Sequence, residues 1–445
     1  MTTESQQQPF KVIIAGGSVA GLTLANMLER AGIDFEVLEK REVAPQLGQS
    51  ILVLPCTNLI HRQLGLQSPT EQGAVPIGVR EHWDDKGKLF CSSDELIQLA
   101  RVQKQPVYFI DRKIYLQNIY DGLSAESKTK VRSQEGIESF TEHESGVTVR
   151  TDKGNVVEGS MLVGADGVHS AVRHLMVQAV QESDPKRAKI LTSGFKTRYR
   201  ILTCTSHNYF AGDPKRPFLK EGMTNNTYYP EHGVGGFTVA GVKGRIFWAI
   251  YIANDDEIPY PSRKYGQADI DEAMKQWGHL HLNPNYTFND LYENLLGANM
   301  LSVEEGVLPT KWHSEGGRAV LMGDSVHKAT ANLGMGGNLC VDDACRLTNG
   351  LNKLLNEQGT KQPSAADLVK VFAAYEKAQR PRADFVCGAS AVFGGFETMS
   401  KWYAKLIKFL FPLVPSSVKM RVFSTFDGGA PVLDFLPLPK DAAAA

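Results

Sequence analysis

The first forty residues alternate strand, turn, helix and strand in an order that few folds accommodate. Residues 11–15 (KVIIA) form a short β-branched apolar run, which is typical of a strand buried in a sheet. The glycine-rich turn GGSVAG at 16–21 leads into residues 22–31, where Leu and Ala recur at helical spacing. Residues 35–39 (FEVLE) form a second strand that ends in an acid. This order predicts a βαβ unit with two parallel strands.

The turn of this unit has the spacing of a dinucleotide-binding loop. Such a loop uses glycines for a tight turn and for close helix–strand packing, and it holds a pyrophosphate on the free N–H groups of the following helix. Gly16 and Gly21 occupy the first and third glycine positions, with Ser18 at the second. Glu39 stands where an acid accepts the hydroxyls of an unphosphorylated ribose. We therefore expect FAD or NAD here, and a turn that serves packing alone is the alternative.

Composition removes several classes of protein. Lys and Arg number 48 against 49 Asp and Glu, a net charge of −1 that argues against a broad nucleic-acid surface. The six cysteines include no C-x-x-C pair, so we expect no disulfide framework, no metal site and a reducing compartment. The N-terminus is too polar for a secretory leader, and no apolar stretch reaches the roughly 20 residues that span a bilayer. A cytoplasmic location is the expectation.

Two further strands end in a carboxylate. Residues 161–166 (MLVGAD) and 318–324 (RAVLMGD) place Asp166 and Asp324 at strand ends, where parallel sheets bind their ligands. A glycine-rich turn follows Asp324 and precedes a helix that we expect over residues 338–355. The N–H groups at the start of that helix would meet an anionic acceptor.

The pattern changes between residues 190 and 254. Strand-like runs rich in Tyr, Thr and Phe alternate there with Gly and Pro turns, which predicts an antiparallel sheet. Residues 270–296 and 364–380 are expected to be helical. We therefore expect an α/β chain whose domains are residues 1–182 (nucleotide binding, first part), 183–300 (mostly β, substrate binding), 301–390 (nucleotide binding, second part) and 391–445 (a helical tail).

Three motifs together resemble one enzyme family. GGSVAGLTLA, VGADGVHSAVR and GDSVHKATANLGMGGNLCVDDACRL occur in this order within residues 12–350 and are similar to the signatures of single-component, class A flavin monooxygenases. The GGS variant, the GDSVHK run and the near-terminal APVLDFLPLP look most similar to a fungal branch that epoxidises or hydroxylates prenylated indoles, indole diterpenes and meroterpenoids. The resemblance implies a p-hydroxybenzoate hydroxylase-like fold: a Rossmann-like FAD-binding domain with an inserted antiparallel sheet.

The resemblance also implies the reaction and the cofactor site. It implies FAD as cofactor, NADPH or NADH as reductant, O2 as co-substrate, and transfer of one oxygen atom from a flavin C4a-hydroperoxide to a large apolar secondary metabolite. By matching position it assigns to the cofactor the residues Gly16, Ser18, Val19, Ala20, Gly21, Glu39, Lys40, Arg41, Arg112, Asp166, Gly167, Asp324, Gly334, Gly336, Gly337 and Asn338.

The match has two departures beside the expected flavin ring. Ala331 stands where relatives usually have proline, and Met335 where they usually have glutamine, so we expect a looser loop. A reductase or dehydrogenase on the same fold, and a flavin-binding scaffold without turnover, are the alternatives. A halogenase is disfavoured, because its W-x-W-x-I-P run is missing and the nearest stretch is FWAIYI at 247–252.

The predicted substrate sheet supplies the candidates for catalysis. Arg200, with Arg198 second, is expected to stabilise a developing anion, because a guanidinium stays charged and presents fixed donors. Two residues apart on a strand, they would face the same side, and a solvated face is the alternative. Tyr228 and Trp248 are expected either to line an apolar substrate pocket or to pack in the core. His327 is expected to fix its loop rather than to shuttle protons.

Lysines and large apolar residues alternate near the C-terminus. Residues 401–413 (KWYAKLIKFLFPL) combine three lysines with Trp, Tyr, Leu, Ile and Phe. This composition suits peripheral contact with an internal membrane surface, and equally an amphipathic helix docked on the domain.

Overall fold

The computed structural model describes residues 9–44, 50–258 and 261–440. Residues 1–8, on which the expectation of no secretory leader rests, lie outside these ranges. At the centre of one half is a five-stranded parallel sheet in the order β19-β11-β1-β2-β7. Its strands are β1 (Lys11–Ala15), β2 (Asp34–Glu39), β7 (Val131–Ser133), β11 (Met161–Gly164) and β19 (Ala319–Leu321).

Helix α1 (Val19–Arg30) connects the first two strands, as the βαβ pattern predicts. Its residues from Val19 to Leu28 are all buried, which places the helix inside the largest apolar cluster of the protein. Because every strand of this sheet is parallel, the loops after β1, β11 and β19 leave the sheet at one edge. That edge gathers the three motifs found in the sequence.

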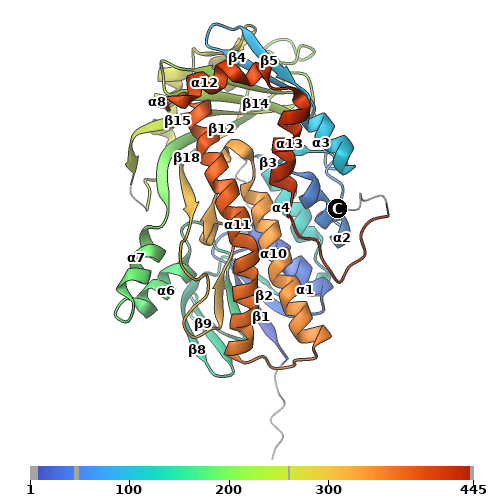
Figure 1. The fold of residues 1–445 in the computed structure, drawn as a ribbon, viewed down its shortest axis with the longest axis vertical. Coiled ribbons are helices and arrows are strands. Elements are labelled where there is room, and N and C mark those ends of the chain that lie inside the picture. Colours follow the sequence, from blue (N-terminus) through green and yellow to red (C-terminus); the bar gives the residue numbers. More distant parts are fainter. Residues whose placement is uncertain (1–8, 45–49, 259–260, 441–445) are drawn as a thin grey trace, which may run out of the picture.

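The second half is built on an eight-stranded mixed sheet in the order β20-β18-β12-β15-β14-β13-β4-β5. Its strands come from most of the chain: β4 (Arg80–Asp84), β5 (Leu89–Ser93), β12 (Lys196–His207), β13 (Thr224–Tyr229), β14 (Val234–Val242), β15 (Arg245–Ile258), β18 (Leu295–Val307) and β20 (His327–Lys328). Figure 1 shows this sheet above the parallel sheet, with the long helix α11 extending along both and α10 beside it in the lower half.

Two sequence expectations about helices were wrong, and the first concerns residues 270–296. Helix α8 (Gln267–Trp277) stops at Gly278, well before the expected end. The residues from Leu295 instead form β18, which pairs along nearly its whole length with β12. Its sequence, LLGANMLSVEEGV, mixes small, polar and apolar residues, so its strand character comes from its partner rather than from its own pattern.

The second concerns helix α11 (Ala365–Glu397), which lies beside helix α10 (Gly336–Asn352) in Figure 1. The sequence pattern predicts an end at residue 380, before Pro381, but the helix continues for more than four further turns. Tertiary contacts hold the continuation: Arg382 Nε donates to Asp342 Oδ2 at 2.7 Å in a buried ion pair with α10. The missing N–H of proline is outweighed by this packing.

The remaining elements surround the two sheets. A three-stranded antiparallel sheet and two short β pairs complete the strands: β8 (Ile137–His143), β9 (Gly146–Thr151), β10 (Val156–Gly159), β3 (Ser50–Val53), β6 (Tyr108–Asp111), β16 (His281–Asn283) and β17 (Tyr286–Thr287). The other α-helices are α2 (Pro55–Leu64), α3 (Glu95–Gln103), α4 (Arg112–Asp121), α5 (Ala125–Thr129), α6 (Ala171–Val180), α7 (Pro185–Ser193), α9 (Phe288–Tyr292), α12 (Tyr403–Leu410) and α13 (Ser416–Asp427). None of the helices in the described ranges has the length and apolar character needed to cross a bilayer.

A candidate dinucleotide site and the sheet beside it

The loop after β1 tolerates no side chain at two of its glycines. A Cβ on Gly21 would lie 1.8 Å from the carbonyl oxygen of Gly16, so helix α1 packs directly on the loop backbone. Gly16 has φ +109°, and a Cβ there would lie 2.4 Å from the Ala165 carbonyl oxygen in the loop after β11. These contacts are the physical reason for glycine at both positions, and they join two of the three motifs.

The N-terminus of α1 presents backbone N–H groups that can bind an anion. Within the described ranges, the N–H groups of Val19 and Ala20 have no acceptor, as expected in the first turn of a helix. The Ser18 hydroxyl accepts a hydrogen bond from Arg112 Nη2 at 2.7 Å. A guanidinium, a hydroxyl and two backbone donors therefore meet at one point, which suits a phosphate.

Glu39 ends β2 beside this loop. Its Oε2 accepts the Gly17 N–H at 2.6 Å, and its Oε1 accepts the Arg41 N–H at 2.8 Å. A Cβ on Gly17 would lie 2.9 Å from Glu39 Cβ, so the close approach depends on glycine. Each carboxylate oxygen keeps another lone pair for a hydroxyl group. Lys40 and Arg41 follow at the surface end of the strand.

Asp166 serves first as a helix cap. Its Oδ2 accepts the N–H groups of Ala171 at 2.6 Å and Val172 at 3.1 Å, at the start of α6. Its Oδ1 is buried and has no partner among the described residues. Burial raises the pKa of Asp166, and the hydrogen bonds from its helix oppose that shift. Gly167, with φ +81°, follows in a conformation that favours glycine.

The loop after β19 carries Asp324 in the 3₁₀ turn η1 (Gly323–Ser325). Asp324 forms an ion pair with Lys328. Burial lowers the pKa of Arg112, and the charge of Asp324 opposes this shift only in part. Arg112 therefore lies within electrostatic reach of both the first and the third loop. Arg173 ties the second loop to the third by donating to the Ser325 carbonyl oxygen at 2.5 Å.

Asp343 and His327 form a buried pair that holds the loop after β19 in place. Asp343 Oδ2, on α10, accepts the Gly323 N–H at 2.5 Å and contacts His327 Nε2 at 2.8 Å. Burial lowers the pKa of His327, but Asp343, together with Asp324 and Asp342, outweighs burial and raises the pKa above the ordinary value. This placement agrees with a loop-fixing role for His327.

The glycine turn before α10 is packed on one side and open on the other. A Cβ on Gly334 would lie 2.6 Å from Leu52 Cβ, and one on Gly337 would lie 2.4 Å from Ile51 Cδ1. A Cβ on Gly336 would meet nothing within 4 Å. The turn therefore leans on β3 while Gly336 faces free space at a helix N-terminus. That space is a cradle for a planar, electron-rich group.

Asn338 does not direct its side chain to a cofactor. Its Nδ2 donates to the carbonyl oxygens of Leu52 and Gly334, and its Oδ1 accepts from the Leu54 N–H and the Thr57 hydroxyl. All its amide hydrogen-bonding groups are thus engaged within the protein. The side chain fastens the start of α10 to β3 and α2, and the expected contact of Asn338 with a cofactor stays a prediction.

The two departures from the family pattern sit around this turn. Met335 is buried in an apolar cluster that also contains Leu333 and Leu339. Ala331, at the start of the 3₁₀ turn η2 (Ala331–Leu333), is exposed. The loosening expected from these residues stays a prediction.

The residues present fit FAD. The site supplies donors for the pyrophosphate around Ser18 and Arg112, an acceptor for ribose hydroxyls at Glu39, and an open helix start at Gly336. Asp166 Oδ1 is a buried acceptor with no protein partner in the described ranges. These groups come from loops at one edge of the parallel sheet, so one extended ligand can contact them together.

Arg200 and Arg198 lie elsewhere than expected. Arg200 pairs across the sheet with Ile252, which belongs to the apolar cluster under α8, so it lies on the face turned away from the cofactor loops. Its Nη1 donates to Asn254 at 3.4 Å. A β-bulge at Arg198 breaks the alternation, and that guanidinium forms ion pairs with Glu257 and Glu305. The bulge removes the alternation from which both arginines were expected to face the same side, and a catalytic role for Arg200 or Arg198 stays a prediction.

Trp248 lies on the same face of the large sheet as Arg200, the face turned away from the cofactor loops. It is fully buried, its Nε1 donates to Ser206 Oγ at 2.9 Å, and its ring packs on Phe288. This placement is a core role and argues against substrate contact. Tyr228 lies on the opposite face, toward α11, with its hydroxyl 2.8 Å from His82 Nδ1 and its ring centroid 4.9 Å from that of Phe396.

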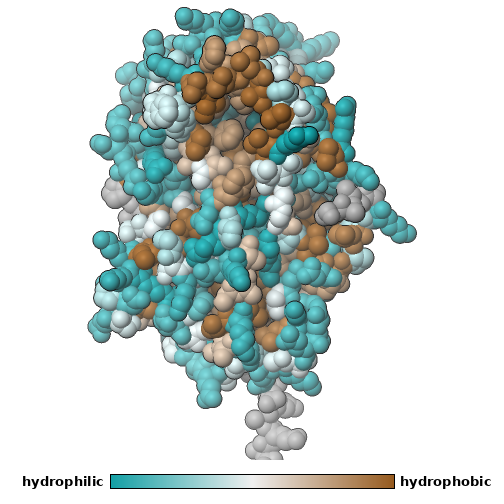
Figure 2. All heavy atoms as spheres, in the orientation of Figure 1, coloured by the Kyte–Doolittle hydropathy of each residue, from teal (hydrophilic) through white to brown (hydrophobic). Residues whose placement is uncertain are grey.

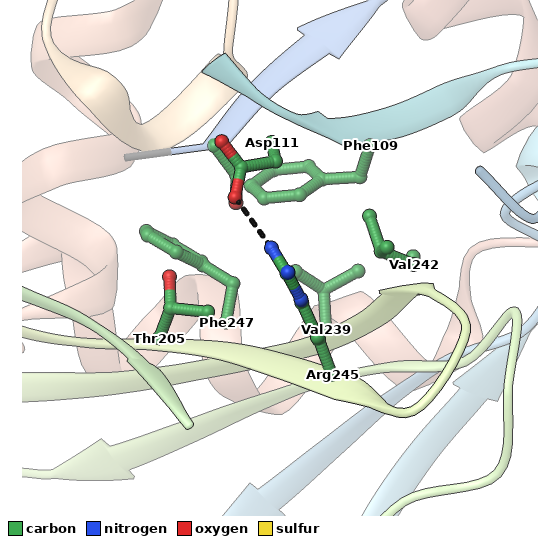
Figure 3. A pocket seen from close by; sticks show the side chains of 9 residues that line it. Phe109, Asp111, Thr205, Val239, Val242, Arg245 and Phe247 are labelled. Atoms are coloured by element: carbon green, nitrogen blue, oxygen red, sulfur yellow. Dashed lines mark hydrogen bonds and ion pairs between the residues drawn. The ribbon is translucent and has the colours of Figure 1, made fainter. Parts of the chain in front are cut away.

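A narrow cavity marks where the two halves meet. Figure 3 shows Phe109 and Phe247 facing each other, and Asp111 Oδ2 accepting from Arg245 Nη1 at 3.0 Å. Asp111 caps α4, so this ion pair links the large sheet to the helix that begins at Arg112. Sequence reasoning missed this link, because it has no motif of its own. It also gave no role to Lys328, although this residue ends the GDSVHK run.

Comparison with known proteins supports the binding of FAD. The profile of the FAD binding domain family matches residues 9–232 and 301–382. The FAD-dependent monooxygenase janM of Penicillium janthinellum is 33% identical, over 97% of this chain and 86% of its own length. FAD-dependent monooxygenase nvfK of Aspergillus novofumigatus is 30% identical, over 98% and 90%. The structure of Klebsiella pneumoniae HpxO complexed with FAD and uric acid superimposes with a TM-score of 0.73 at 19% identity, covering 96% of this chain and 98% of that one.

Replacing Gly21 by alanine is expected to abolish binding of FAD. The new Cβ would displace either α1 or the loop backbone that presents the N–H donors. Gly388→Ala is the matched control, because a Cβ on that helical glycine would meet nothing within 4 Å. The measurement is flavin absorbance per protein after gel filtration with excess FAD. Equal flavin content in both variants would contradict the assigned role of the loop.

The His327–Asp343 pair is expected to make stability depend on pH. Because the pKa of His327 is raised in the folded state, the pair contributes fully below the unfolded value of about 6.5, and the contribution disappears as the pH rises through the folded value. The melting temperature lost in His327→Asn should therefore be larger at about pH 6 than at about pH 8.5. His143→Asn, at an exposed histidine near Glu158, is the control with little change. A loss that grows with pH would contradict the assignment.

Proposed function

This chain belongs to the FAD-binding family of the FAD-dependent monooxygenases, and on that basis we propose that it transfers one oxygen atom of O2 to a large apolar metabolite, by epoxidation or hydroxylation, with NADPH or NADH as reductant. The observation that carries the proposal is the meeting of Ser18, Arg112 and Asp324 at the edge of the parallel sheet. These residues come from separate segments of the chain, and an extended dinucleotide would contact all of them.

The chain's own groups perform distinct parts of the work. Bound FAD supplies the two-electron carrier and the reaction with O2. Ser18, Arg112 and the N-terminus of α1 hold the pyrophosphate, and Glu39 orients the ribose. The N–H groups at Gly336 and Gly337 point from a helix start and stabilise negative charge beside them. The strand β3 packs against that glycine turn and excludes water from its packed side.

The face of the large sheet that lies toward the cofactor loops supports an apolar substrate. Tyr199, Ile201 and Tyr251 form a buried cluster there, with Phe237 and Phe247 packed against it. The ring centroids of Tyr199 and Tyr251 stack at 5.0 Å. Side chains of this kind would contact a large hydrophobic molecule through apolar area rather than through ion pairs. HpxO, which shares the fold, is described in complex with a small molecule, uric acid.

Anaerobic reduction followed by admission of air tests the reaction. We expect NADPH or NADH to bleach the flavin absorbance of the purified protein, and air to restore it. Addition of prenylated indoles or meroterpenoids is expected to yield a product with one additional oxygen atom. Bleaching without any oxygenated product would favour the reductase alternative. Absence of bleaching with bound flavin would favour the scaffold.

We also propose that the C-terminal helices contact an anionic membrane surface. Trp402, Phe409 and Leu413 are 85%, 72% and 70% exposed, on or beside α12. Residues 398–426 contain five Lys and Arg and no Asp or Glu. Figure 2 shows apolar residues gathered over the region of α12, in contrast to the hydrophilic surface around them. An apolar face flanked by cations matches the headgroup region of a bilayer, where an apolar substrate also resides.

Sedimentation with lipid vesicles tests this surface. We expect binding to phosphatidylcholine vesicles that contain phosphatidylserine, and weaker binding without it. The double variant Trp402→Ser/Phe409→Ser should lose most of this binding. Val102→Ser/Val156→Ser is the matched control, because both valines are more than half exposed elsewhere. Equal binding by the two double variants would contradict the proposed surface.

A further inference from the structure

Glu397, at the end of α11, joins the cofactor half to the large sheet. Its Oε1 accepts from Asn226 Nδ2, on β13, at 3.1 Å. Its Oε2 accepts from Asn332 Nδ2, in the 3₁₀ turn η2 just before the glycine turn of the cofactor loop. One carboxylate therefore bridges the loop expected beside the flavin and the strand expected beside the substrate. Neither Glu397 nor its two partners belongs to the site residues assigned from the sequence.

The bridge determines how the two amides point. An ionised carboxylate only accepts hydrogen bonds, so both asparagines must turn their NH2 groups toward it. Their carbonyl oxygens, Asn226 Oδ1 and Asn332 Oδ1, then point away. Both oxygens are buried and have no partner among the residues that the structure describes. Leaving buried acceptors unpaired is costly, which indicates that something absent from the protein alone satisfies them.

The surroundings are mainly apolar, and a glycine lets them pack closely. A Cβ on Gly394 would lie 3.3 Å from Asn332 Oδ1 and 3.2 Å from the ring of Tyr199. Phe396 and Tyr228 pack together on the neighbouring side, with their ring centroids 4.9 Å apart. The two unpartnered oxygens are therefore polar atoms in mainly aromatic surroundings. A hydrogen-bond donor on an otherwise hydrophobic molecule suits such surroundings.

We propose that Asn226, Asn332 and Glu397 form a polar subsite for the substrate, which accepts a hydrogen bond from a hydroxyl or N–H group of an otherwise apolar molecule. The subsite rests on the proposed function, because Asn332 lies in the loop expected beside the flavin. It would contact a substrate only if that substrate binds next to the flavin. Asn226 and Asn332 are the specificity residues. Glu397 is a positioning residue, which acts by orienting the two amides.

Protonation of Glu397 changes the subsite. Burial raises the pKa of Glu397 to about 7, against its hydrogen bonds to Asn332 and Asn226 and the charge of Arg80. Arg80 on β4, Tyr228 on β13 and Tyr251 on β15 are the charged and titratable groups that interact with it. A protonated carboxyl donates one hydrogen bond, so one amide must turn its oxygen inward and its NH2 outward. Below the pKa of Glu397, the subsite should therefore favour a ligand with a hydrogen-bond donor less strongly.

Farnesol and farnesyl methyl ether are a matched pair of probes, because only the alcohol donates a hydrogen bond. Their dissociation constants are measured from the flavin absorbance change of the holoenzyme, whose spectrum shows beforehand that flavin is bound. At about pH 8 we expect the alcohol to bind about tenfold more tightly than the ether. At about pH 6 the ratio should fall toward one, since Glu397 is then mostly protonated. This comparison of the two ratios uses the unmodified protein.

Three variants locate the effect. Asn226→Leu should bring the ratio at high pH close to one, and Glu397→Gln should make the ratio independent of pH. Thr203→Val is the matched control and should keep the wild-type ratio and its pH dependence, because Thr203 Oγ1 donates only within the sheet, to Asn299 O at 3.1 Å. Bound flavin with equal affinities for alcohol and ether, or with binding of neither, would overturn the subsite and leave the proposed function standing. A protein that takes up no flavin would overturn both.

Discussion

The close packing of helix α1 on the loop after β1 is the contact on which the rest of the structure depends. A Cβ on Gly21 would come within 1.8 Å of the Gly16 carbonyl oxygen, so no other residue brings the helix start to this position. The same loop touches Ala165 of the second motif, and Arg112 spans from Ser18 toward Asp324 of the third. Local glycine geometry thus determines where an extended dinucleotide meets the edge of the parallel sheet.

The sequence predicted the parts of the protein that local chemistry determines. The strand Lys11–Ala15, the following helix and the strand ending in Glu39 occur as expected, because the 2-residue and 3.6-residue periods and the glycine turn are encoded within forty residues. The loops carrying Asp166 and Asp324 lie at strand ends for the same reason. The family and the fold followed from the three motifs together, and the comparisons confirmed both.

The parts that depend on distant partners were not predictable in this way. Strand β18 is a strand because β12 lies beside it, and helix α11 passes Pro381 because Arg382 is held by Asp342. The bulge at Arg198 depends on the register of three strands, so the sequence alone could not show on which face of the sheet Arg198 and Arg200 lie. Glu397 gave no signal at all, since its partners lie 171 and 65 residues away in the chain. Such a cluster exists only once both sheets are assembled.

Titration of the flavin-free protein with FAD and with FMN is the sharpest test of the dinucleotide site. Ser18, Arg112 and Glu39 are expected to contact the pyrophosphate and the adenosine ribose, which FMN lacks as a linked unit. We expect one FAD bound per chain, with FMN at least about 100-fold weaker, a difference that corresponds to two or more lost charge-assisted hydrogen bonds. Equal affinity for the two flavins, or binding of neither, would contradict the site described above.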